Sequence, residues 1–207
     1  MGLKNSGVGV KEGGAHFVKR IKFTEYARIQ SNPGITITDE NTRVDMDRAE
    51  LSTAITDVAQ NTGMWYCEIV PQHTSEHGHS IGITTAPRIL HWNYAQNGAE
   101  RDFTLLPSGK IMRGKRTIKG TGLSWDQGDV IQLALDFNSY YIWVGVNGTW
   151  ALDKPAPVKP SLYHVALYKN SNKSVPTWLV NFGEREFTYQ RPPHYAPGFG
   201  LIRRASQ

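Results

Sequence analysis

Residues 128–148 read GDVIQLALDFNSYYIWVGVNG, and this stretch decides the fold of the chain. Residues 130–137 are nearly all apolar, as in a strand that is buried on both of its faces. Residues 140–146 have the alternating pattern of a second strand. Asn147-Gly148 then favours a two-residue turn, because both turn positions need a positive φ that Asn and Gly tolerate. We therefore expect a hairpin between residues 141–146 and 150–152.

The same alternation recurs in residues 35–38, 64–70, 80–84, 162–168 and 177–182. Turn signals rich in Gly, Asn, Pro and Asp separate these segments, and Pro107-Ser108-Gly109 predicts a second hairpin between residues 103–105 and 110–112. No long stretch downstream of residue 34 has a helical period. Many short strands punctuated in this way indicate an all-β chain folded as an antiparallel sandwich or barrel.

Residues 1–34 differ from the rest of the chain, because glycines are frequent in their first half and bulky apolar and basic residues follow. Phe17 and Ile21 fit one face of a helix, whereas Ile21 and Phe23 fit the alternation of a strand, so periodicity leaves the choice open. We expect a basic arm or linker over residues 1–34, a β-sandwich over residues 35–200 and a short tail over residues 201–207.

Composition excludes several classes of protein. The chain has 207 residues, enough for one large domain or one domain with an arm, and a net charge of +5 that permits an acidic partner. Its single cysteine, Cys67, excludes an internal disulfide framework and is expected to be a small core residue. We see no signal peptide and no apolar run long enough to cross a bilayer, and we expect a soluble protein.

Five segments occur in an order and spacing that resemble the successive strand motifs of SPRY domains. They are GMWYCEI (residues 63–69), SIGI (80–83), GDVIQLALDF (128–137), YIWVGVNG (141–148) and VNFG (180–183). The resemblance covers about residues 35–200 and implies an antiparallel sandwich of the concanavalin A-like lectin type. It also implies a domain that binds proteins through loops at one end and performs no catalysis. The segment between Gly82 and Gly128 departs from the family pattern, because residues 94–98 fit that pattern only loosely and a basic hairpin comes after them.

The end of the chain adds a finer resemblance. Residues 181–189 (NFGEREFTY), followed by Pro192-Pro193 and Gly198-Phe199, are similar to the ending of SPRY-like modules in bacteriophage and prophage structural proteins. This similarity favours a component of a virion.

Aromatic residues are the first candidate binding residues. Trp65, Tyr66, Trp143 and Phe182 fall in predicted strands and are expected in the core. Those expected in or beside loops, where rigid amphipathic rings suit the recognition of a protein or a sugar, are Trp92, Tyr94, Trp125 and Trp150.

Basic residues gather in two segments, which either are solvated faces or dock onto acidic surfaces. The candidate docking residues are Lys19, Arg20 and Lys22 in the arm, and Lys110, Arg113, Lys115, Arg116 and Lys119 in the basic hairpin. A metal site is a further alternative at His73, His77 and His79, since residues two apart on an extended segment point to the same side. The other interpretation of these histidines is a polar loop.

No group of residues has the pattern of a nucleophile, a base and a residue that orients the base, so we expect no enzymatic activity and no cofactor. The leading hypothesis is a virion structural or adhesion protein. Its arm would dock onto other virion proteins, and its sandwich would bind a host receptor or a surface glycan, in a homo-oligomer. The alternatives are a cytoplasmic SPRY adaptor that binds a short peptide, and a carbohydrate-binding domain. We expect no contact with membranes and no nucleic-acid partner, because the basic segments lack interleaved aromatics.

Overall fold

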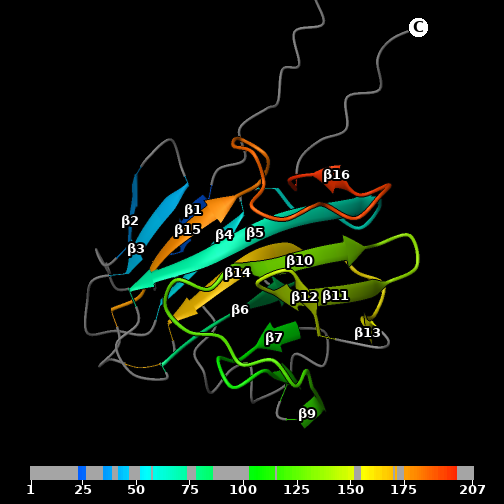
Figure 1. The fold of residues 1–207 in the computed structure, drawn as a ribbon, viewed down its shortest axis with the longest axis horizontal. Helices are drawn as coiled ribbons and strands as arrows, with labels where there is room; N and C mark the ends of the chain where they lie inside the picture. Colours follow the sequence, from blue (N-terminus) through cyan, green and yellow to red (C-terminus); the bar gives the residue numbers. More distant parts are fainter. Residues whose placement is uncertain are drawn as a thin grey trace, which may run out of the picture.

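A computed structural model describes residues 23–26, 35–38, 42–46, 52–56, 58–73, 78–85, 103–114, 116–151, 155–169, 171 and 175–199. All regular structure in these residues is β-strand, in two sheets that form a sandwich (Figure 1). The prediction of an all-β antiparallel sandwich is confirmed. Within the described ranges no helix is long and apolar enough to span a membrane.

We call the two sheets A and B. Sheet A consists, in order of hydrogen bonding, of β1 (Phe23–Tyr26), β4 (Ser52–Thr56), β14 (His164–Lys169), β6 (His79–Thr84), β7 (Phe103–Leu105), β8 (Lys110–Arg113) and β9 (Arg116–Gly120). Sheet B consists of β12 (Thr149–Trp150), β11 (Tyr141–Val146), β10 (Ile131–Asp136), β5 (Met64–His73), β15 (Thr177–Asn181), β3 (Arg43–Met46) and β2 (Ile35–Thr38). Two short strands join sheet B at its sides: β13 (Ala156–Pro157) pairs with β11, and β16 (Ala196–Pro197) runs parallel to β5.

The hairpin turn at Asn147-Gly148 has the predicted geometry. Asn147 has φ of 49° and Gly148 has φ of 80°, and Val146 pairs with Thr149 across the turn. The Asn147 side chain also fixes the approach to β10, since its Oδ1 accepts from the amide of Val130 and its Nδ2 donates to Asp129. The second predicted hairpin is present as β7 and β8.

The core lies between the sheets and is built by alternate residues of each strand. Trp65, Cys67 and Ile69 of β5 point into it, as do Ile131, Leu133 and Leu135 of β10. The intervening residues of these two strands are also buried, on the outer face of sheet B. The prediction that this run of β10 is buried on both faces is therefore confirmed, and the outer cover is the segment after β15.

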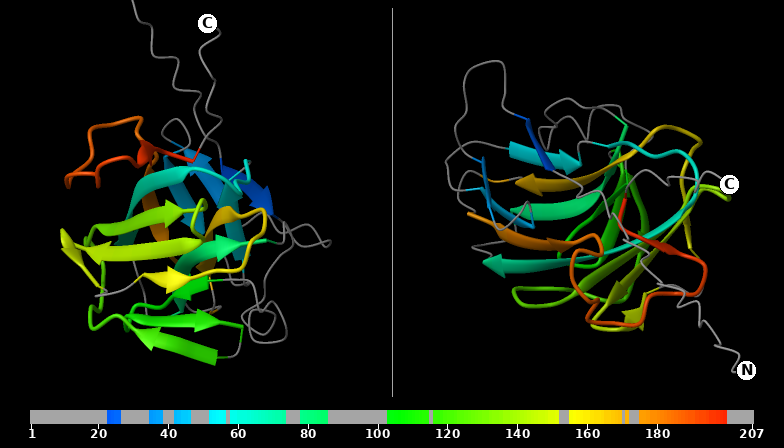
Figure 2. Two further views of the ribbon diagram at one scale, coloured as in Figure 1. Left: turned by 90° about the vertical axis from the view of Figure 1, so that its right-hand side faces the viewer. Right: turned by 90° about the horizontal axis from the view of Figure 1, so that it is seen from above.

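This cover, residues 182–199, is named the C-terminal strap. It follows β15 and runs beside β5, where it carries β16 (orange to red in Figure 1). Phe199 ends the strap in the core, with ring centroids 6.1 Å from Trp65 and 6.0 Å from Phe137. In Figure 1 and in the left view of Figure 2, the strap and the green β8–β9 hairpin lie at opposite ends of the molecule.

Strand β1 lies inside the segment that we expected to be an arm. It pairs antiparallel with β4, with Phe23 opposite Thr56 and Tyr26 opposite Thr53. Residues 23–26 are therefore the outermost strand of sheet A. Of the two alternatives left open by the sequence, helix or strand, the strand is correct for these four residues.

Candidate functional site

The outer face of sheet B carries three rows of side chains that cross β5, β10 and β11. The pairing registers place Met64, Asp136 and Tyr141 in the first row and Tyr66, Ala134 and Trp143 in the second. The third row holds Glu68, Gln132, Gly145 and Trp150, the last of them from β12. The middle row places a methyl group between two large aromatic rings, so the face is hollow over Ala134.

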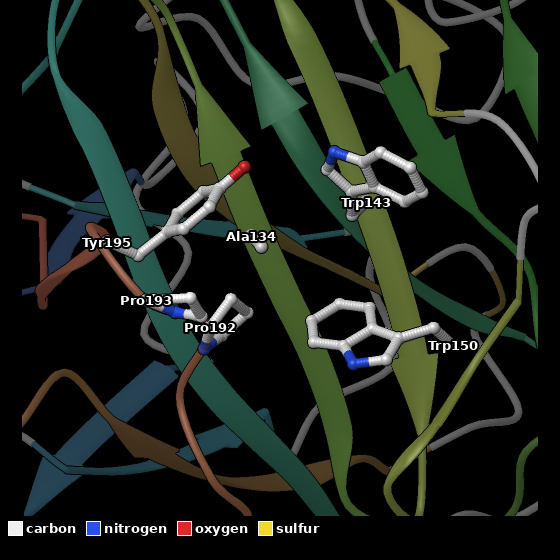
Figure 3. Close-up of a pocket in the computed structure, with 6 residues that line it drawn as sticks. All are labelled: Ala134, Trp143, Trp150, Pro192, Pro193 and Tyr195. Atoms are coloured by element: carbon white, nitrogen blue, oxygen red, sulfur yellow. The ribbon is translucent and has the colours of Figure 1, made fainter.

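The hollow is one wall of a pocket of about 420 Å³. Trp143 and Trp150 line it on the β11 side, and Pro192, Pro193 and Tyr195 of the strap line it on the β5 side. Figure 3 shows these two walls with Ala134 between them, so the pocket follows the direction of β10. Its volume lies in the range of small-ligand sites, which are concave and mostly apolar.

Gly145 positions one of the indoles. A Cβ at this position would lie 3.2 Å from Cε3 of Trp150 and 2.9 Å from Oε1 of Gln132. A side chain at this position would crowd both groups, so glycine lets the Trp150 ring pack close to the backbone of β11. The Trp150 ring also approaches Tyr66, with ring centroids 6.5 Å apart.

A buried carboxylate ties the strap to sheet B. Glu68 is 2% exposed, and its two oxygens accept hydrogen bonds from the amides of Thr188 (2.8 Å) and Tyr189 (2.9 Å). It also accepts from the hydroxyl of Tyr66 at 3.0 Å. Because the acceptor of these backbone amides is a carboxylate, the hydrogen bonds are of the stronger, charge-assisted kind.

The network continues from Tyr66 to the hairpin turn. Gln132 Nε2 donates to the Tyr66 hydroxyl at 3.0 Å, and Gln132 Oε1 accepts from the amide of Gly148 at 2.8 Å. The Tyr66 ring also packs edge to face with Phe187 of the strap, at a centroid distance of 4.8 Å. Sheet, strap and turn are thus joined beside the pocket, which favours a preformed site.

Two tyrosines of this region are held in the neutral form. Burial raises the pKa of Tyr66 well above its usual value, so its hydroxyl remains a donor to Glu68. Burial and the nearby charge of Asp136 raise the pKa of Tyr195. Tyr195 therefore offers the pocket a hydroxyl donor, at the end toward Asp136.

Gly148 tests the packing of the strap on the turn. A Cβ here would lie 2.8 Å from two ring atoms of Tyr189, whereas a Cβ at Gly128 would meet nothing within 4 Å. Both glycines have positive φ, of 80° and 87°, so alanine strains both backbones alike. We expect Gly148→Ala to lower the free energy of unfolding by about 1 kcal/mol more than Gly128→Ala, in chemical denaturation. Equal losses would show that Tyr189 does not press on the turn.

Sequence reasoning placed the aromatic residues only in part. Trp150 lines the pocket, whereas Trp92 and Tyr94 lie outside the described residues. Trp125 lies in a loop as expected, but it is 3% exposed and does not line the pocket, because it packs in the core against Trp178 and His79. Trp143 was wrongly expected in the core.

Trp143 could have been found by strict alternation on β11. Ile142 and Val144 point into the core, so the residue between them must face outward. Tyr66 is buried as predicted, but on the outer face, under the strap. The strap residues Pro192, Pro193 and Tyr195 had no sequence signal of their own, because their role depends on how the segment folds back.

The segment from His73 to His79 was expected to be either a metal site or a polar loop, and its last residue, His79, fits neither description. His79 is the first residue of β6 and is 3% exposed, with its ring 5.2 Å from Trp125 and 5.5 Å from Trp178. His73 ends β5 and is exposed, and His77 lies outside the described residues. Among the residues that the structure describes, no three His, Cys, Asp or Glu side chains gather as a metal site would require.

The basic hairpin is formed by β8 and β9, at the edge of sheet A. Lys110, Arg116 and Lys119 are exposed, and Arg113 is half-buried and donates to the carbonyl of Pro157. Lys115 and the arm residues Lys19, Arg20 and Lys22 lie outside the described residues. Every described residue of β9 is exposed, and charges on such an edge strand also discourage pairing with other chains.

The Cys67 thiol and the Asp45 carboxylate both have surroundings that suit a role in the fold. Cys67 is buried in the core as predicted, and burial raises the pKa of its thiol, which makes it a poor nucleophile. Asp45 accepts from Arg43 at 2.8 Å and from Thr177 at 2.6 Å. Although partial burial opposes it, these contacts lower the pKa of Asp45.

Comparison with solved structures identifies the fold. The SPRY domain of human HERC1 superposes with a TM-score of 0.58 at 14% identity, over 73% of this chain and 94% of that domain. A human SPRY domain gives a TM-score of 0.55 at 13% identity over 74% of this chain and 98% of its own, and the TRIM65 PSpry domain gives 0.51 at 12% over 78% and 90%. The chain therefore has the fold of a SPRY domain. No protein-family model and no curated protein matches the sequence.

Proposed function

We propose that this protein is a non-enzymatic binding module that takes up a segment of a partner protein in the pocket on sheet B. The observation that carries this proposal is the pocket itself, whose walls are two indoles on one side and two prolines and a tyrosine on the other. Tryptophan and tyrosine are the side chains that most often supply binding energy at protein interfaces. The SPRY fold agrees with a role in protein binding, as the sequence resemblance implies.

The pocket chemistry favours a peptide over a sugar. The polar atoms of the lining side chains are the indole N–H groups of Trp143 and Trp150 and the hydroxyl of Tyr195. A sugar needs partners for many hydroxyl groups, and a polar group buried without a partner costs roughly 1–3 kcal/mol. A peptide can bury apolar side chains here and leave most of its polar groups in water.

Selection from a random peptide library displayed on phage tests the proposal. The protein serves as bait, and the selected pool is then depleted on the Trp150→Ala variant. Enrichment of peptides that bind wild type and not the variant supports the function. A pool that binds both proteins equally, or no enrichment, would contradict it, as would binding on a glycan array that depends on Trp150.

The setting that we propose for this module is a virion, where residues 1–22 dock onto other virion proteins and the pocket binds a host receptor. Its support is the sequence resemblance of residues 181–199 to phage SPRY-like modules. A deletion that tests docking must stop before Phe23, because β1 pairs with β4 and its loss would open the edge of sheet A. We expect the protein without residues 1–22 to keep its melting temperature and to lose incorporation into particles. Normal incorporation would refute the docking role.

The basic hairpin is the second docking surface of this proposal. Lys110, Arg116 and Lys119 are exposed on β8 and β9, which suits an acidic protein surface. It lies at the other end of the molecule from the strap (Figure 2), so one partner could be held there while another occupies the pocket.

A further inference from the structure

We infer that the pocket on sheet B binds a proline-rich segment in the polyproline II conformation, with a lysine or arginine beside Asp136. This inference rests on the proposed function and names the class of peptide. Its first support is the composition of the walls: Trp143, Trp150 and Tyr195 face Pro192 and Pro193 across Ala134 (Figure 3). Grooves lined by aromatic side chains are the surfaces on which extended proline-rich peptides dock.

The second support is the match of hydrogen-bonding groups. A polyproline II segment has no internal hydrogen bonds, and its prolines have carbonyl acceptors but no N–H donors. The lining side chains offer the opposite set, because indole N–H groups donate only and the neutral Tyr195 hydroxyl can donate. Figure 3 shows the Trp143 nitrogen and the Tyr195 oxygen at the same end of the pocket, where they can reach a ligand carbonyl.

The third support is charge complementarity at that end. Asp136 follows Ala134 by two residues on the same face of β10, and its charge acts on Tyr195. Its Oδ1 accepts from the amides of Asn138 (3.0 Å) and Ser139 (3.1 Å), which orients the carboxylate, and Oδ2 can accept from a ligand.

The spacing fits as well. Two residues along a strand span about 6.8 Å, and two residues of polyproline II span about 6.2 Å. The pocket follows β10, so the residue two positions from a proline seated over Ala134 lies level with Asp136. Polyproline II turns by a third of a turn per residue, so this residue needs a long side chain such as that of arginine or lysine to reach the carboxylate. A ligand lysine or arginine at that position would form an ion pair with the Asp136 carboxylate.

Binding of four synthetic probes, measured by calorimetry, tests the inference. The first is an acetylated peptide of six prolines with one arginine after the third proline. The second has glutamate in place of the arginine, the third has glycine and serine in place of the prolines, and the fourth is chitotriose. We expect the first probe to bind at least about tenfold more tightly than each of the others. Equal binding of the first and third probes, or tighter binding of chitotriose, would overturn the inference.

Variants assign the contact. We expect Trp150→Ala to weaken the first probe at least about tenfold and Leu162→Ala to leave it unchanged, because Leu162 is 53% exposed and does not line the pocket. Asp136→Asn keeps the oxygen that accepts from Asn138 and Ser139, so it should weaken the arginine probe about fivefold while the glutamate probe gains or stays equal. An equal loss of affinity for both probes would contradict the proposed ion pair between Asp136 and the arginine of the ligand. If the display selection yields peptides that need Trp150 but contain no proline, the proposed function stands and this inference fails.

Discussion

Gly82→Ala lowers the free energy of unfolding by about 3 kcal/mol, or prevents folding, in the largest single-residue effect that we expect. A Cβ at Gly82 would lie 1.8 Å from the carbonyl oxygen of Phe103, on the neighbouring strand β7. Because the obstacle is backbone, no side-chain rotation relieves the overlap, and β6 and β7 must separate. For a chain of this size the loss corresponds to a fall in melting temperature of roughly 6–12 °C.

Gly120→Ala is the matched control for this change. Gly120 also lies in a strand of sheet A, and a Cβ there would meet nothing within 4 Å. We expect the control to stay within about 0.5 kcal/mol of the wild type. Calorimetric melting of both variants checks the prediction, and an equal loss at the two positions would contradict the close approach of β6 and β7.

Glu68→Gln is the second large effect, because it changes the carboxylate that holds the strap. The amide side chain keeps one acceptor oxygen but turns an N–H₂ toward groups that themselves donate, the amides of Thr188 and Tyr189 and the Tyr66 hydroxyl. Hydrogen bonds to charged groups contribute about 1.5–3 kcal/mol, so we expect a loss of about 2–3 kcal/mol. The strap should also open more often than in the wild type.

Hydrogen exchange resolves where this loss occurs. In Glu68→Gln we expect the amides of Thr188 and Tyr189 to exchange at least about tenfold faster, while the amides of β14 in sheet A change little. Glu186→Gln is the control, since Glu186 is an exposed glutamate of the same strap. Uniform acceleration over the whole chain, or none in the strap, would show that Glu68 does not anchor it.

The Glu68 prediction connects the fold to the pocket. Glu68 does not line the pocket, yet Pro192, Pro193 and Tyr195 are held against sheet B by the strap that Glu68 anchors. Loss of the anchor should therefore weaken binding in the pocket even though every lining side chain is retained.

Local sequence located several of the strands and both hairpin turns, although β3 and β4 were not predicted. Alternation located β5, β10, β11 and β15, and Asn147-Gly148 located the turn, because both signals depend on neighbouring residues only. Strand β9 was missed as a strand in its own right, since all its residues are exposed and it lacks an apolar face. The choice between sandwich and barrel needed the pairing of strands that lie far apart in sequence.

The site was less accessible to sequence reasoning, for physical reasons. Trp125 lies in a loop, as expected, but its side chain fills the core against Trp178 and not a binding surface, through a contact between distant segments. Trp143 looked like a core residue but faces outward, where the strap and not the opposite sheet adjoins it. A pocket whose one wall is a folded-back strap depends on tertiary contacts such as those of Glu68, and no local pattern encodes them.

The indole N–H signals of tryptophan in a ¹H–¹⁵N correlation spectrum test the central claim most directly. Trp65 donates its indole N–H to the carbonyl of Thr62 at 2.8 Å, and Trp125 and Trp178 are buried in the core. On titration with the most enriched peptide from the display selection, we predict that the signals of Trp143 and Trp150 move in a saturable manner and that those of Trp65, Trp125 and Trp178 stay in place. Saturable binding that leaves the Trp143 and Trp150 signals unmoved would contradict the assignment of this pocket as the binding site.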